Sequence, residues 1–199
     1  MTQMSAKAGI LRFGDAARDA MRREFQQLDD KGIFEPIRGD TLSPDARKQA
    51  LRCINIIKEK RDGRIKGRTC ADGRPQCLLY DKADTSSPTA SSDAIMLMIM
   101  IDAIERRDVA TADVTGAYLN AEMDDFVLMK LAGEDAQIMC NVNPSYAADY
   151  TVNENGKTVL YLRLLYLRLA RALYGCVRSA MLWYKQPVCH DPQRFGFHT

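Results

Sequence analysis

The chain has 199 residues, 46% of them hydrophobic, and a formal net charge of +2. That length and composition suit one globular domain, and so small a net charge favours no class of partner. The longest apolar run, residues 94–101, is too short to cross a bilayer, and no signal peptide opens the sequence. We therefore expect an intracellular protein with no membrane partner, whose compartment is otherwise unknown.

Histidine and cysteine exclude two kinds of chemistry. The two histidines, His190 and His198, lie near the end of the sequence, so no Ser-His-Asp or Cys-His catalytic set is credible. The six cysteines include no pair with the two-residue spacing of a zinc knuckle. The one remaining arrangement for zinc is Cys189 with His190 and His198, which is possible on paper.

Charge is unevenly distributed along the chain. Residues 47–76 contain ten Lys or Arg against three acidic residues, whereas residues 108–135 contain seven acidic residues against one Lys. Residues 156–186 are basic again, with six Lys or Arg and no acidic residue. Basic segments suit phosphate groups and an acidic one suits a metal ion, although each also suits a solvated surface.

The first half of the chain predicts a helix and a β-hairpin. Residues 1–13 have no strong periodicity and are expected to be flexible. Residues 15–31 follow as a helix, capped by its first residue and apolar on one face. Further on, strands at residues 51–60 and 65–71 flank an Arg-Asp-Gly-Arg turn at residues 61–64.

The second half mixes helices and strands. Residues 92–107 predict a helix that is apolar nearly all round and therefore buried. We expect it to pack on a sheet that contains a strand at residues 109–114. Further expected elements are a short helix at 116–122, strands at 126–131 and 159–162, and a helix from 180 to 185. Because helices and strands do not alternate regularly, the fold class is α+β.

A tandem repeat stands out near the end. Residues 161–165 read Tyr-Leu-Arg-Leu-Leu and residues 166–170 read Tyr-Leu-Arg-Leu-Ala. Five residues are too few for a solenoid unit, so we interpret the repeat as an insertion. Because an odd shift exchanges the two faces of a strand, we expect the insert to bulge ahead of Leu173.

Asp113 is the first candidate site residue. It ends an apolar strand and precedes a turn with a glycine and an aromatic, Gly116 and Tyr118. A carboxylate at a strand end can hold a hard cation such as Mg²⁺. Asp113 can also cap the helix that follows, and the pattern alone favours the cap.

The hairpin is the second candidate. It contains six cations, Lys58, Lys60, Arg61, Arg64, Lys66 and Arg68. Because alternate side chains of a strand project from one face, Lys66 and Arg68 can reach the same phosphates. The alternative is a solvated edge strand that its charge protects from pairing with another chain.

The motifs, in this order and spacing, resemble the reverse transcriptases of copia-type retrotransposons. Residues 58–68 resemble their fingers hairpin, and residues 113–120 resemble their first catalytic motif. Weaker likenesses are the opening at residues 24–35, Ser87-Pro88-Thr89 before the apolar helix, and Leu173-Tyr174-Gly175 with Trp183-Tyr184. The resemblance covers roughly residues 15–197.

This resemblance implies a fold and an activity. Residues 14–199 would form the fingers and the first half of the palm of a reverse-transcriptase-like polymerase fold. Such an RNA-directed DNA polymerase binds an RNA or DNA primer–template and deoxynucleotides. It adds each nucleotide by in-line transfer with two Mg²⁺ ions.

The resemblance also implies residue roles. Asp113 would be the first metal-binding carboxylate, and Val114 would offer a backbone carbonyl beside it. Tyr118 would pack under the sugar and exclude a 2′-hydroxyl. Arg68, with Lys66, would grip the incoming triphosphate.

Three departures count against activity. The family's Tyr-x-Asp-Asp hairpin, which brings two further carboxylates, does not occur in these residues, so we expect a truncated and inactive polymerase. The repeat shifts Leu173 by five residues, and Arg178 stands where the family usually has Gln. The alternatives are a non-catalytic remnant that binds nucleic acid and a decayed protein without a ligand.

Overall fold

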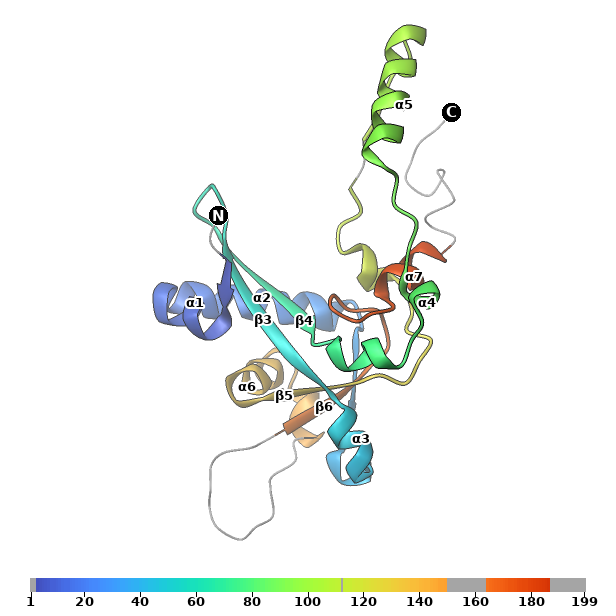
Figure 1. The fold of residues 1–199 in the computed structure, drawn as a ribbon. Coiled ribbons are helices and arrows are strands. Elements are labelled where there is room, and N and C mark those ends of the chain that lie inside the picture. Colours follow the sequence, from blue (N-terminus) through green and yellow to red (C-terminus); the bar gives the residue numbers. More distant parts are fainter. Residues whose placement is uncertain (1–2, 112, 150–163, 187–199) are drawn as a thin grey trace.

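The described part of the protein is an α+β fold built on one mixed sheet (Figure 1). The computed structural model describes residues 3–111, 113–149 and 164–186. The sheet has the order β1-β3-β5-β6-β2, and β4 pairs with β3. Strand β3 is parallel to β5, and the other pairs are antiparallel.

The strands are β1 (Gln3–Ser5), β2 (Phe34–Ile37), β3 (Leu51–Glu59), β4 (Ile65–Ala71), β5 (Leu128–Ala132) and β6 (Leu164–Leu169). The α-helices are α1 (Ala6–Phe13), α2 (Asp15–Asp30), α3 (Pro44–Gln49), α4 (Lys82–Thr85), α5 (Ser92–Glu105), α6 (Gly133–Val142) and α7 (Ser179–Tyr184). The 3₁₀ helices are η1 (Gly39–Thr41), η2 (Arg74–Leu78), η3 (Ala117–Asn120) and η4 (Pro144–Asp149).

Strands β3 and β4 form the predicted hairpin. At its turn, the Lys60 N–H donates to the Arg64 carbonyl at 2.9 Å, and the Arg64 N–H donates to the Asp62 carboxylate at 3.1 Å. Gly63 takes a φ of +77°, which a residue without Cβ adopts at little cost. The local sequence therefore fixes the turn and the register that follows from it.

Helix α2 covers one face of this hairpin. Its apolar stripe, which includes Met21, Phe25 and Leu28, is buried as the sequence predicted. A Cβ at Gly67 of β4 would lie 2.8 Å from the Ala20 carbonyl oxygen, so glycine permits the close approach. The helix begins as expected, but Gly14 is its N-cap, and Asp15 lies in the first turn without capping it.

The N-terminal residues correct one expectation. We expected residues 1–13 to be flexible, but β1 pairs with β3 in antiparallel register, and α1 packs beside it. Gly9 of α1 lies so close to Ile57 that a Cβ would come within 2.6 Å of that side chain. The periodicity of the sequence did not predict this strand, because three residues are too few to show an alternating pattern.

The repeat also departs from expectation. We expected the insert to bulge ahead of Leu173, but the second copy forms most of β6, between β5 and β2. Leu165, Leu167 and Leu169 are fully buried in the main core. Residues 161–163 of the first copy, and the strand predicted at 159–162, lie outside the described residues.

Helix α5 contradicts the prediction of burial. It spans Ser92–Glu105, close to the expected range, yet it projects away from the sheet (Figure 1). Ile95, Leu97 and Ile99 are 50%, 58% and 51% exposed. The strand predicted at residues 109–114 is absent among its described residues, and Val109 is 62% exposed. The expected packing of this helix on that strand is therefore wrong.

Candidate nucleic-acid interface

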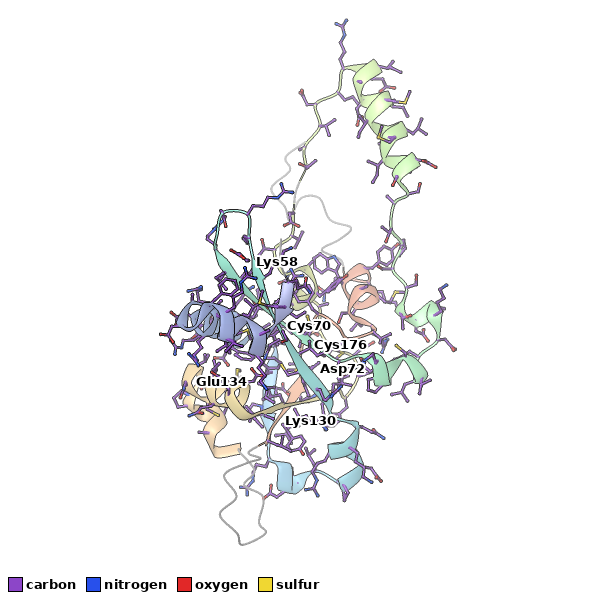
Figure 2. All side chains as sticks on the ribbon, turned by 60° about the vertical axis from the view of Figure 1, so that its left-hand side comes forward. Lys58, Cys70, Asp72, Lys130, Glu134 and Cys176 are labelled. Atoms are coloured by element: carbon purple, nitrogen blue, oxygen red, sulfur yellow. The ribbon has the colours of Figure 1, made fainter. Side chains whose placement is uncertain are left out.

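One face of the hairpin gathers cations. Lys58 lies opposite Lys66, and Ile56 lies opposite Arg68, so these side chains project away from α2. They line a cavity of about 580 Å³ together with the cations of the turn. We call this surface, made by Lys58, Lys60, Arg61, Arg64, Lys66 and Arg68, the basic face. Figure 2 shows Lys58 and Cys70 along the hairpin and Asp72 near its base.

The charges of the basic face are largely uncompensated. Arg64 pairs with Asp62 in the turn, but within the described part of the chain none of the other five cations forms an ion pair. Some cations elsewhere are paired: Arg18 pairs with Glu134 and Arg168 with Glu35, both at 3.0 Å. The basic face therefore concentrates positive charge that an anion can neutralise.

Glu24 is the carboxylate beside this face. It comes from α2, and its Oε1 accepts a hydrogen bond from the Thr69 N–H at 3.0 Å. Burial raises the pKa of Glu24, and the nearby charges of Lys66 and Arg68 lower it. Glu24 thus accepts a hydrogen bond from a backbone N–H of β4. It makes no ion pair with Lys66 or Arg68 in the described structure.

An aromatic contact joins the basic face to two distant segments. The Arg68 guanidinium lies over the Tyr174 ring at 5.2 Å from its centroid. The rings of Tyr174 and Tyr118 lie 5.3 Å apart and are tilted by 53°. The structure thus brings together Arg68 and Tyr118, two of the residues that the resemblance singled out. It adds Tyr174, for which no role was predicted.

Asp113 and Val114 lie outside this cluster. Asp113 is exposed and has no hydrogen bond or ion pair with another described residue. Val114 is half-buried, and η3 begins three residues later, at Ala117. Gly116, not Asp113, is the N-cap of η3, so the capping interpretation is not supported either.

Candidate metal-binding side chains do not cluster in the described residues. In residues 3–111, 113–149 and 164–186, no three His, Cys, Asp or Glu side chains are grouped so that they could hold a metal ion. Two-metal transfer needs carboxylates on both sides of the metal pair, and Asp113 is isolated. Asp113 is therefore the one carboxylate of the family's set that the described residues supply.

Arg178 forms a second polar cluster. It pairs with Asp124 at 2.7 Å and with Asp125, and its guanidinium lies over the Tyr80 ring. Asp124 is exposed and Asp125 is partly buried, and both accept hydrogen bonds from Arg178. A hydrogen bond from the Tyr80 hydroxyl lowers the pKa of Asp125, and burial raises the pKa of Tyr80 to about 12. This cluster links three segments: Tyr80 just after η2, Asp124 and Asp125 just before β5, and Arg178 at the start of α7.

Two features of the site were not predicted from the sequence. One is Tyr174, whose contact with Arg68 joins residues far apart in the chain. The other is Asp72, a buried carboxylate that accepts hydrogen bonds from Arg52 at 3.1 Å and Arg74 at 2.8 Å. The hydrogen bond from Arg74 lowers the pKa of Asp72, in spite of burial. Alternation along β3 places Arg52 on the same face as Lys58. This is the one sequence signal that indicates the position of Arg52.

Compared with protein-family models, with curated proteins and with solved structures, the chain matches none. Among the described residues, no helix combines the length and apolar content that a membrane span requires.

Proposed function

We propose that this chain is the fingers and part of the palm of a copia-type reverse transcriptase, and that these residues bind nucleic acid without polymerising it. The ligand is the phosphate backbone of a primer–template, which contacts the basic face. Polymerisation is not expected from these 199 residues, because Asp113 is isolated and no Tyr-x-Asp-Asp sequence is present. No catalytic step is assigned to them.

The observation that carries the proposal is the set of unpaired cations on one face of the hairpin. Five of them make no ion pair with another described residue, and they line one cavity. A basic face of this kind releases counterions when it meets phosphates, which makes binding favourable and dependent on salt. Charge that served only to protect an edge strand would not need to gather on one face.

A second observation supports the family. The resemblance rests on motifs far apart in the sequence, and three of them meet in the fold. Arg68 belongs to the fingers hairpin, Tyr118 to the first catalytic motif, and Tyr174 to the Leu-Tyr-Gly motif.

Salt-dependent binding tests the nucleic-acid half of the proposal. We expect the purified chain to bind a primer–template duplex at low salt and to lose affinity steeply as salt rises. Lys66→Ala/Arg68→Ala should reduce the slope of log affinity against log salt by roughly 2. The control, Arg18→Ala/Arg22→Ala, removes two charges from α2 that are already paired and should leave the slope unchanged.

Binding that ignores both salt and the Lys66→Ala/Arg68→Ala substitution would refute this half. Primer extension on an RNA template with Mg²⁺ tests the other half, with Asp113→Asn as control. We expect no extension by either protein. Extension that disappears in Asp113→Asn would show that the chain is an active polymerase.

A further inference from the structure

We propose that Tyr174 is a positioning residue that holds the Arg68 guanidinium in place on the basic face, ready to bind a phosphate. The proposal rests on the proposed function and goes beyond it, because it assigns a role to a residue that does not itself meet the nucleic acid. The juxtaposition that carries it is the stack of Arg68 on Tyr174, which in turn packs against Tyr118.

Arg68 needs such a support. It is exposed on β4 and has no ion pair in the described structure. A free arginine side chain samples many rotamers, and each must be given up when the guanidinium binds a phosphate. Burial raises the pKa of Glu24 and the charge of Arg68 opposes that rise, so the two groups attract one another. A ring under the guanidinium restricts the rotamers and competes with this attraction.

Tyr174 supports the guanidinium without competing for its hydrogen bonds. A guanidinium that stacks on a ring uses its flat face, and its five N–H donors point outward in its plane. These donors stay available to the oxygens of a phosphate, to which arginine often binds through two parallel hydrogen bonds. A carboxylate in the place of the ring would instead occupy the donors and cancel the charge.

The ring of Tyr174 is itself fixed. The backbone carbonyl of Tyr174 accepts a hydrogen bond from the Ala71 N–H at 2.8 Å, which ties Tyr174 to the end of β4. The next residue, Gly175, lies so close to Ala71 that a Cβ would come within 2.1 Å of the Ala71 carbonyl oxygen. The ring of Tyr118, which belongs to η3, packs on the ring of Tyr174. The support is therefore attached to the same strand as the side chain that it holds.

Binding measurements with matched variants test the role. Tyr174→Leu should weaken binding of the primer–template duplex at low salt about two- to fivefold, the effect of losing an exposed cation–π contact. Tyr174→Phe keeps the ring and should bind like the unchanged protein. The control Phe126→Leu removes the ring that lies 5.8 Å from Arg168, away from the basic face, and should also bind normally. In an Arg68→Ala background, Tyr174→Leu should cause no further loss.

A thermal double-mutant cycle separates this inference from the proposed function, because it needs no ligand. Arg68→Ala and Tyr174→Leu should together lower the Tm by less than the sum of their separate effects, since each removes the same contact. Additive Tm shifts would overturn the inference, even if the chain binds DNA. So would equal binding by Tyr174→Leu and Tyr174→Phe. An unchanged protein that binds no primer–template duplex refutes the proposed function, and the phosphate-binding part of the inference falls with it, even if the Tm shifts are coupled.

Discussion

The hairpin with α2 and the arm that carries α5 show opposite relations between sequence and burial. In the hairpin layer, apolar side chains such as Met21 and Ile57 are fully buried, and the cations lie on the opposite face. In α5, six consecutive apolar side chains are at least half exposed, Ile95, Met96, Leu97, Met98, Ile99 and Met100. Both segments form the expected element, but only the first finds a partner among the described residues.

This difference separates two kinds of information. Local patterns, such as alternation in a strand and Asp-Gly in a turn, determine which element forms. Burial depends on the segment that packs against the element, and that segment often lies far away in the sequence. The composition of α5 predicted a helix correctly, but the prediction of burial was wrong, because nothing in residues 3–111, 113–149 and 164–186 covers it.

The largest contrast should come from one substitution made in both regions. Met21→Ala in α2 removes a fully buried side chain and should lower the free energy of unfolding by about 2–5 kcal/mol. Met98→Ala in α5 removes a side chain that is 54% exposed and should change it by less than about 0.5 kcal/mol. Urea denaturation measures both. Equal losses would show that α5 is packed in solution, and the comparison would then fail.

Backbone packing at the base of the hairpin should give the next largest effect. Gly175 has a φ of +89°, and a Cβ there would collide with the Ala71 carbonyl. Gly175→Ala should therefore cost about 2–4 kcal/mol, from backbone strain and overpacking together. Gly63→Ala in the open turn meets no atom within 4 Å and should cost only about 1–2 kcal/mol. A smaller loss at Gly175 would mean that this close contact does not hold the hairpin.

Acid should loosen the base of the hairpin. The pKa of Asp72 is lowered in the folded state by Arg74, so its pairing stabilises the protein at neutral pH. That stability is lost as pH falls below the unfolded pKa of about 4 toward the folded value. The Tm of the unchanged protein should therefore fall more steeply below about pH 4 than the Tm of Asp72→Asn. Parallel curves would contradict the role of this carboxylate.

Features of the fold that depend on neighbouring residues were predicted from the sequence better than features that depend on tertiary contacts. The hairpin, α2 and α7 follow from turn residues and periodicity, and they lie close to their expected ranges. Burial of α5 and the path of the repeat were wrong, since both depend on tertiary partners. The site divides in the same way: alternation predicted that Lys66 and Arg68 share a face, but no spacing rule predicts that Tyr174 lies under Arg68.

The repeat offers the smallest expected effect. If residues 161–165 are deleted, Val159 and Leu160 precede the second copy in the sequence, and β6 keeps the pattern of two aliphatic residues followed by Tyr-Leu-Arg-Leu. Because the local pattern is unchanged, we expect the Tm to remain the same or rise slightly. A clear fall would show that Val159 and Leu160 cannot take the places of Leu164 and Leu165 in β6. Circular dichroism during heating is sufficient for this comparison.

Lysine reactivity tests the central claim most directly, because it locates the bound nucleic acid on the protein. The chain is acylated under mild conditions with and without a primer–template duplex, and each lysine is read by mass spectrometry. We expect the duplex to slow acylation of Lys58, Lys60 and Lys66 on the basic face. Lys48 and Lys82, which are exposed elsewhere, should react at the same rate in both samples. Uniform protection, or protection of Lys48 and Lys82 alone, would contradict the account.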